Sequence, residues 1–406
     1  MLKYSEIRAK IDFEKNNGYY EELAHFTHYI QNHRNGVSQH FKKKAVNFYT
    51  NNIAGINCVG EPELQQLLPL KFDVPFPPPE NPEFTFIDLF AGIGGFRIPL
   101  QELGGQCVFS SEYDYYARRA YEMNFGEVPF GDITELDLEL VPKHDMLCAG
   151  FPCQPFSISG KLKGFEDTRG TLIYYVFRII ERRFPKVVLL ENVKHLLYLD
   201  KKRTLKTIIK HLEELGYNVS FNILNASDFG VPQNRERIII VGSFEKKFNF
   251  DEIGYVNVKP KLKDFLDKKN NYEYIQEPYT ILEDQKLQDS GLIFAGYRNK
   301  KIRKAGVRPN TEYLSRVHKQ PNRIYSTEGI HPALPSQESS GRFWIYHNGK
   351  VRKLTISECY RIMGFPGKFK LINSRGELYK QIGNSVCIPM VKELGRQVIK
   401  QLLKTW

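Results

Sequence analysis

The sequence predicts an α/β protein in which a mostly parallel sheet carries helices on both faces, with a small irregular domain and a helical N-terminal extension added to it. Between residues 84 and 243, short runs of β-branched and aromatic residues alternate with helical patterns, as is typical of βαβ units. A glycine-rich turn follows the first of these runs directly. The 406 residues have room for two or three domains, at about 100–200 residues each.

Composition and charge narrow the class of protein. The 58 Lys and Arg residues exceed the 46 Asp and Glu residues, which gives a net charge of +12 and favours a polyanionic partner such as nucleic acid. No apolar run approaches the 18 or so residues that a membrane helix needs, and the first residues lack a signal-peptide core, so we expect a cytoplasmic protein without a membrane partner. The six cysteines form no C-x-x-C pair, so neither a metal site nor a disulfide framework is expected.

Residues 1–82 form a block of their own. Apolar residues recur at helical spacing around 19–30 and 41–53, which predicts a mainly helical extension. Nine Lys or Arg residues balance nine Asp or Glu residues there, so the block contributes nothing to the excess charge. Prolines at 75, 77, 78 and 79 favour a stiff, extended linker. The extension is expected either to pack against the core or to serve as an added DNA-contacting or regulatory module.

The elements of the sheet region follow in order along the chain. Strands are predicted at 84–90, 106–111, 145–149, 186–191, 218–224 and 237–242. Helices are predicted at 95–103, 114–124, 171–182 and 204–215. Residues 245–350 show no long periodic segment, whereas 351–406 return to helical patterns that end at 390–403. We therefore expect an extension (1–82), a first part of the main domain (83–244), an inserted domain (245–350) and a C-terminal part (351–406).

The turn after the first strand suggests a cofactor. Gly92, Gly94 and Gly95 allow a ligand to approach the backbone closely at the carboxyl edge of the sheet. The final small residue of a dinucleotide fingerprint is replaced by Arg97, so a nucleoside without phosphates, such as S-adenosylmethionine, fits better.

Three residues at the ends of later segments could complete such a pocket. Glu112 ends the second strand and can accept hydrogen bonds from both ribose hydroxyls. Tyr113 could stack on an adenine, and Asp132 could accept from the adenine amino group. Each of the two acids alone is better explained as a surface residue than as a ligand, but the ordered set at successive strand ends favours a binding site.

A reactive centre is predicted at the same edge. Cys153 follows the third strand between two prolines, which makes it a candidate nucleophile, with an incidental loop thiol as the alternative. Glu191 ends an apolar strand, where burial would raise its pKa and let it donate a proton. Arg235 and Arg237 are two residues apart, so an extended segment would project both to one face, where they could hold a carbonyl oxygen and a phosphate.

A basic window lies within the irregular insert. Residues 298–323 contain nine Lys or Arg residues and one acid, with Tyr297, Tyr313 and Tyr325 interleaved or adjacent. Such a run can be a nucleic-acid contact or simply a solvated face.

Six motifs together resemble the DNA cytosine-5 methyltransferase family. The resemblance covers about residues 84–243 and 351–398. The motifs stand in the order DLFAGIGG (88–95), GFPCQPFS (150–157), ENV (191–193), QNRER (233–237), RKLTISEC (352–359) with GFP (364–366), and QIGNSV (381–386). The family implies an S-adenosylmethionine-dependent, Rossmann-like methyltransferase fold, with residues 245–350 as a target-recognition domain inserted into the catalytic domain.

The resemblance also implies roles. Cys153 adds to carbon 6 of a cytosine flipped out of the duplex, Glu191 acts at N3, Arg237 holds O2, and Arg235 positions the base and the catalytic loop. Glycines and serines within 154–170 suit a mobile lid. The S-adenosylmethionine pocket is expected to comprise Phe90, Gly92, Gly94, Gly95, Glu112, Tyr113, Asp132, Ile133, Leu172, Asn384, Ser385 and Val386. DNA contacts are expected from Gln154, Ser157, Arg298, Lys300, Arg303, Arg308 and Arg323.

The expected partner is duplex DNA, with a cognate restriction endonuclease as a genetic rather than physical partner. The expected protein is a monomer in a bacterial cytoplasm, associated with the nucleoid. One position departs from the family: Ala333 precedes Leu334 where many members have threonine, which puts that threonine's local contact in doubt.

Three other functions stay open as alternatives. A tRNA-methylating enzyme shares the Pro-Cys-Gln motif, but the Cys-Phe-Thr tripeptide associated with that branch is missing after Val241. A DNA-binding regulator could use residues 1–82. A nicotinamide oxidoreductase is opposed by Arg97 and leaves the cysteine loop unexplained.

Overall fold

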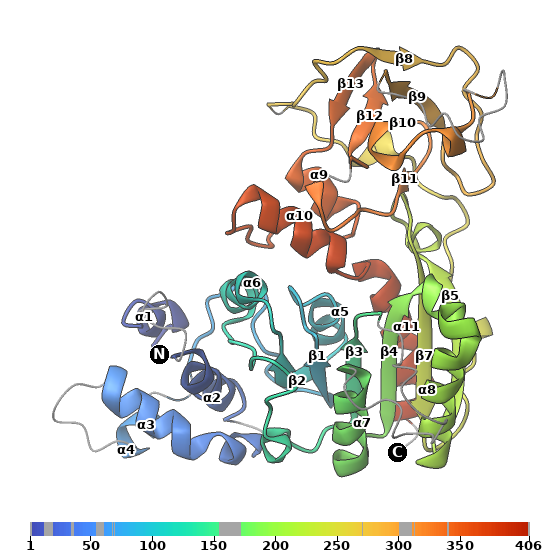
Figure 1. Cartoon of the computed structure of the whole chain (residues 1–406). Helices are drawn as coiled ribbons and strands as arrows, with labels where there is room; N and C mark the ends of the chain where they lie inside the picture. Colours follow the sequence, from blue (N-terminus) through green and yellow to red (C-terminus); the bar gives the residue numbers. More distant parts are fainter. Residues whose placement is uncertain are drawn as a thin grey trace.

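A computed structural model places a helical extension beside a large α/β unit, with a smaller sheet domain above it (Figure 1). It describes residues 2–11, 19–33, 36–53, 61–66, 68, 70–153, 172–269, 271–299, 311, 313–338 and 341–404. In this described part of the chain, no helix is both long and apolar enough to cross a membrane.

The main sheet has six strands in the order β2-β1-β3-β4-β7-β5. They are β1 (Phe84–Leu89), β2 (Gly105–Ser111), β3 (Met146–Gly150), β4 (Val187–Val193), β5 (Asn218–Asn225) and β7 (Glu236–Ser243). The pairs β2–β1, β1–β3 and β3–β4 are parallel, whereas β7 runs antiparallel to both of its neighbours. The mostly parallel sheet confirms the predicted fold class, and every strand bound lies within two residues of its prediction.

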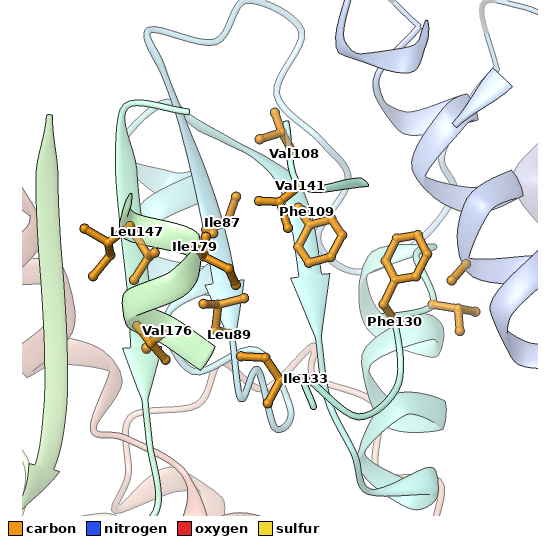
Figure 2. Packing of buried hydrophobic residues seen from close by; sticks show 14 of the residues in the cluster. Ile87, Leu89, Val108, Phe109, Phe130, Ile133, Val141, Leu147, Val176 and Ile179 are labelled. Atoms are coloured by element: carbon orange, nitrogen blue, oxygen red, sulfur yellow. The ribbon is translucent and has the colours of Figure 1, made fainter. Parts of the chain in front are cut away.

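Helices cover both faces of this sheet. They are α5 (Arg97–Glu102), α6 (Tyr115–Phe125), α7 (Leu172–Arg183), α8 (Arg203–Glu214) and α11 (Ile388–Val398), the last continuing into a π-helical turn (Ile399–Leu403). Successive strand residues point to opposite faces: Val188 of β4 is buried in the cluster of α7 and α8, and Leu189 in the cluster of α5 and α11. Figure 2 shows part of the cluster on the α7 face of the sheet, with Val176 and Ile179 of α7 over Leu147 of β3.

The helix predicted at 95–103 begins two residues late. Gly94 has φ +85°, which L side chains rarely adopt, and a Cβ on it would lie 2.3 Å from the ring of Phe125. Gly95 and Phe96 therefore belong to the turn, and α5 starts at Arg97.

The N-terminal extension packs on the open edge of the sheet beside β2 (Figure 1). Its helices are α1 (Tyr4–Arg8), α2 (Tyr19–Gln31), α3 (Lys42–Asn52) and α4 (Glu61–Gln66), with a short 3₁₀ turn (Val37–His40) before α3. Phe26 and Ile30 of α2 are fully buried in the same cluster as Phe109 of β2 and Phe130. Phe109 and Phe130 stack with ring centres 4.9 Å apart (Figure 2). The extension thus completes the hydrophobic core of the large unit.

The smaller domain contains a sheet that the sequence did not reveal. Its strands are β8 (Tyr279–Ile281), β9 (Phe294–Arg298), β10 (Arg323–Ser326), β12 (Trp344–His347) and β13 (Lys350–Lys353), in the order β13-β12-β10-β9-β8. Strands of three to five residues show too few alternations for a period to stand out. Ala295, Ile324, Trp344 and Val351 form their small core.

Two connections tie this domain to the large unit. Strand β13 crosses the predicted boundary at residue 350 and belongs to the small sheet, after which α9 (Ile356–Arg361) and α10 (Arg375–Asn384) lead back. A two-residue strand, β11 (His331–Pro332), pairs in parallel with β6 (Gln233–Asn234), immediately before β7. Residues far apart in the sequence therefore meet at the upper edge of the main sheet.

Because the extension and the sheet share one core, a cavity in α2 should weaken the whole large unit. We expect Phe26→Ala to lower the free energy of unfolding by about 3–5 kcal/mol, as for other buried aromatic truncations. Urea denaturation followed by circular dichroism measures the change. The control is Lys43→Ala, at an exposed position of α3. Unchanged hydrogen exchange of the β2 amides in Phe26→Ala would show instead that the extension folds independently.

Candidate active site

A cavity of about 630 Å³ opens at the carboxyl ends of β1, β3 and β4. It gathers segments that lie far apart in the sequence, including the turn after β1, the residue just before β7, and the end of α10. Thirteen of the predicted site residues line it: Phe90, Gly92, Glu112, Tyr113, Asp132, Ile133, Cys153, Leu172, Glu191, Arg235, Arg237, Asn384 and Ser385. This volume is in the range of pockets that enclose a small molecule.

The glycine turn shapes one wall of this cavity. Phe90 has φ +55°, a left-handed conformation that costs a bulky residue strain and is often found at binding sites. Gly95 is required by packing, since a Cβ there would lie 2.7 Å from Cγ2 of Val386 and 2.9 Å from Oγ of Ser385. Gly94, Gly95 and Val386 therefore support the wall from behind and do not line the cavity.

Glu112 is held rigidly beside that turn. Its Oε2 accepts a hydrogen bond from the Gly92 amide at 2.7 Å, and its Oε1 accepts one from the Asp114 amide at 2.7 Å. Burial raises the pKa of Glu112, and the hydrogen bonds from these two amides offset part of that rise. Each carboxyl oxygen keeps a second acceptor site, so the side chain can receive two hydroxyl groups of a ligand.

The rest of this end of the cavity is aromatic and acidic. Tyr113 is 76 % exposed although it lines the cavity, so its ring is free to cover a planar ligand. Asp132 Oδ1 accepts from the Thr134 amide at 2.9 Å. Asp114 caps α6 by accepting from the Ala117 amide and also forms an ion pair with Lys380 of α10.

The other end of the cavity holds a buried acid and its guanidinium partner. Oε1 of Glu191, a residue that is only 7 % exposed, lies 2.8 Å from Nε of Arg237. Burial raises the pKa of Glu191, while Arg237 and Arg235 oppose that rise; the net direction is upward. A carboxyl group so placed can hold a proton closer to neutral pH than a free glutamate.

Cys153 lies on the wall of the same cavity and is partly buried. Burial raises the pKa of its thiol. Asn192, beside Glu191, donates from Nδ2 to the carbonyl of Phe151 at 2.8 Å, and so fixes the backbone two residues before the thiol. The sequence analysis included Asn192 in a motif but assigned it no role. Its position directly after Glu191 was the one sign that it belongs to the site.

Arg235 and Arg237 diverge in what they hold. Arg235 is 2 % exposed, and its two terminal nitrogens donate to the carbonyls of Gly383 at 2.7 Å, Ser385 at 2.6 Å and Leu334 at 3.3 Å. This guanidinium therefore joins the end of α10 and the residue after it to the segment that follows β11. The sequence suggested that one of the two arginines could hold a phosphate. Arg235 does not fit that expectation, because its guanidinium is buried and bonded to three carbonyls.

The residues expected to contact DNA are only partly described. Gln154, Ser157, Lys300, Arg303 and Arg308, and the lid expected at 154–170, lie outside the described residues. The guanidinium of Arg298 forms an ion pair with Glu277 and lies 5.3 Å from the ring centre of Trp344. Arg323 donates to the carbonyl of His318 at 3.0 Å. Both arginines thus have partners within the small domain, and a DNA contact for them stays a prediction.

The residues present suit an S-adenosyl cofactor without phosphates. Glu112 offers acceptors for a ribose, Tyr113 and Phe90 offer ring faces, and Asp132 offers an acceptor for an amino group. Within the described part of the chain, no group of three or more His, Cys, Asp or Glu side chains could hold a metal ion.

Comparison with known proteins gives consistent matches. The family model for C-5 cytosine-specific DNA methylases matches residues 84–400. The Type II methyltransferase M.HhaI of Haemophilus parahaemolyticus is 40 % identical over 325 residues, which cover 77 % of this chain and 93 % of that protein. M.HpaII of Haemophilus parainfluenzae is 42 % identical over 361 residues, covering 85 % and 97 %.

Solved structures agree in fold. A putative DNA modification methyltransferase from an Escherichia coli prophage aligns with a TM-score of 0.56 at 20 % identity, covering 79 % of this chain and all of that one. The Dnmt2 methyltransferase of Schizosaccharomyces pombe aligns with a TM-score of 0.54 at 19 % identity, covering 80 % and 99 %.

The raised pKa of Cys153 can be tested by alkylation. Only the thiolate reacts with iodoacetamide, so a raised pKa moves the reaction to higher pH. We expect the rate at Cys153 in the ligand-free protein to reach half its maximum above pH ~8.5, the value for a free cysteine. Mass spectrometry of the labelled peptide measures this rate, with a free cysteine peptide as reference and Cys153→Ser as control. A midpoint below the reference would mean that a nearby positive charge stabilises the thiolate.

Proposed function

The chain belongs to the C-5 cytosine-specific DNA methylases, and from that membership we propose how its own residues methylate carbon 5 of a cytosine in a short, specific duplex sequence. The observation that carries the proposal is that one cavity has a thiol, a buried carboxyl group and a guanidinium at one end, and Glu112, Tyr113 and Asp132 at the other. Such a cavity can bring a cytosine and an S-adenosyl cofactor together.

The chemistry explains the thiol. Carbon 5 of cytosine is a weak nucleophile, and a Cys153 thiolate that forms a bond from Sγ to carbon 6 pushes electron density toward carbon 5 and N3. Glu191 protonates or hydrogen-bonds N3 and so stabilises that density. Arg237, fixed on Glu191 at 2.8 Å, holds the O2 oxygen. S-Adenosylmethionine, when bound, supplies the electrophilic methyl group that carbon 5 takes up.

The product leaves when the covalent bond is undone. N3 returns its proton to Glu191, and a base removes the proton from carbon 5. The carbon 5–carbon 6 double bond then re-forms, and the Sγ–carbon 6 bond breaks to release Cys153 as a thiolate. The base must leave the duplex stack to reach Cys153, because the thiol lies inside a cavity that a double helix cannot enter.

Binding of the cofactor falls to the opposite end. Glu112 receives the ribose hydroxyls, Tyr113 and Phe90 cover the adenine, and Asp132 accepts from its amino group. Asn384 and Ser385 follow α10 back to the cavity, where Arg235 holds the carbonyls of Gly383 and Ser385, and close the site from the C-terminal side. The small domain is the candidate reader of the DNA sequence, and the biological role proposed is modification of host DNA beside a Type II restriction endonuclease.

Cys153→Ala should reduce methyl transfer to background, because no covalent bond to carbon 6 can form. The measurement is transfer of tritiated methyl groups from S-adenosylmethionine to duplex DNA, run beside tRNA. The matched control is Cys148→Ala, at a buried thiol of β3 in the core, which should retain most of the activity. Substantial transfer by Cys153→Ala, or transfer to tRNA in preference to DNA, would refute the proposal.

Bisulfite sequencing of DNA from cells that express the wild-type chain supplies the recognition sequence. Methylated cytosines confined to one short sequence are expected. Cytosines left unmodified throughout would contradict the function itself.

Glu191→Gln should lower kcat by about 10²- to 10⁴-fold, the usual contribution of a general acid. Since burial keeps the pKa of Glu191 above its ordinary value, the wild-type rate should decline as pH rises through that pKa, and this decline should disappear in the variant. Affinity for S-adenosylhomocysteine should be unchanged. A variant with the wild-type pH profile would show that Glu191 is not the proton donor.

A further inference from the structure

The N-terminal extension makes polar as well as apolar contacts with the large unit. Three side chains on one face of α2 carry them: Thr27, His28 and Gln31, all at most 5 % exposed. Residues three and four apart lie on the same face of a helix, so one helix can place all three against the core. We call these three side chains the brace. The family model begins only at residue 84 and therefore includes none of them.

The brace holds the backbone of residues 125–131, which we call the strap. Oγ1 of Thr27 accepts from the Val128 amide at 3.0 Å, and Nε2 of Gln31 donates to the Phe125 carbonyl at 2.6 Å. Buried backbone groups need such partners, and here the extension supplies them to a segment outside the regular strands.

His28 reaches the neighbouring strand. Its Nδ1 donates to the Ala24 carbonyl at 2.8 Å, which leaves Nε2 to accept from the Ser110 amide of β2 at 3.2 Å. This pattern needs the neutral ring, and burial lowers the pKa of His28 accordingly.

The strap leads directly into the cofactor end of the cavity. The Phe130 amide donates to the Ser110 carbonyl at 2.9 Å, and the Glu112 amide donates to the Phe130 carbonyl at 2.8 Å. The strap thus aligns with β2 and ends where Asp132 and Ile133 line the cavity. Its position sets the spacing between Glu112 and Asp132.

Gln31 also supports the glycine turn. Its Oε1 accepts from a terminal nitrogen of Arg97 at 2.6 Å, and Arg97 in turn pairs with Glu127 at 2.7 Å. The guanidinium carbon of Arg97 lies 4.8 Å from the centre of the Phe125 ring, against which Gly94 packs. A single amide of the extension therefore ties the start of α5 to the end of α6.

We propose that the brace positions the adenosine half of the cofactor pocket, with Thr27 and Gln31 as positioning residues that act through the strap and Arg97. The proposal rests on the proposed function, in that the cavity takes an S-adenosyl ligand. It gives the extension a part in cofactor binding that does not depend on an excess of charge, which agrees with its balanced charge.

The test uses the full chain with Thr27→Val and Gln31→Glu. The first removes, at nearly constant volume, the hydroxyl that accepts from the Val128 amide and donates to the Ala24 carbonyl at 3.2 Å. The second keeps the acceptor for Arg97 but loses the donor to Phe125. We expect the dissociation constant for S-adenosylhomocysteine, measured by isothermal titration calorimetry, to rise about five- to tenfold, part of the effect of leaving a buried polar group without its partner. KM for S-adenosylmethionine should rise likewise, while kcat at saturation and KM for DNA stay unchanged.

Two controls keep the outcome unambiguous. Thr27→Ser retains the hydroxyl and should bind S-adenosylhomocysteine with wild-type affinity. Lys44→Ala removes an exposed ion pair with Glu21 on the outer side of the extension and should leave all constants unchanged. Variants that are less stable but bind S-adenosylhomocysteine normally would overturn the proposal, as would a rise confined to KM for DNA. Failure of the proposed function would appear separately, as wild-type protein that does not methylate DNA.

Discussion

The site depends on one reversed strand. In a parallel sheet, residues that precede a strand lie at the edge opposite to those that follow one, so Arg237 at the start of its strand could not meet Glu191 at the end of another. Strand β7 runs antiparallel to β4, with Arg237 opposite Val193 and Glu191 opposite Ile239. The two side chains are diagonal neighbours across this pair, a spacing that long side chains span.

This pairing also makes the buried acid tolerable. An ionised carboxylate away from water is costly unless it is paired, and removal of one member of a buried pair typically costs about 3–5 kcal/mol. Arg237 offsets that cost when Glu191 is ionised, while burial favours the protonated form. Because these two effects oppose each other, Glu191 can gain or lose a proton during a reaction.

The sequence predicted most of this arrangement, and the reasons for its failures are physical. Five of the six strands in the main sheet have six or more residues, and the sixth, β3, is an apolar run followed by a distinctive motif. The positions of β1 to β5 and β7 along the chain, and the residues at the strand ends, were therefore predictable. The direction of β7 was not, because hydrophobic pattern is the same in both directions. The small sheet was not predicted because its strands are short. The different roles of Arg235 and Arg237 were not predictable either, because Arg235 is held by Gly383 and Leu334, which are distant in sequence. The brace was equally hidden, since Thr27 and Gln31 resemble ordinary helix residues until the fold brings Val128 and Phe125 against them.

The position of Arg235 links the small domain to the chemistry. Strand β11 pairs with β6 immediately before Arg235, and the Arg235 guanidinium then holds Leu334, two residues beyond β11, together with Gly383 and Ser385 beside the cavity. A bond to a backbone carbonyl does not depend on the side chain of the residue that supplies it. Ala333 can therefore replace the usual threonine while this connection is kept. A shift of the small domain that displaced Leu334 would have to move or break contacts of a guanidinium that also holds the wall of the cavity. Within the proposed function, the small domain and the catalytic cavity are thereby joined through backbone carbonyls that one buried guanidinium holds together.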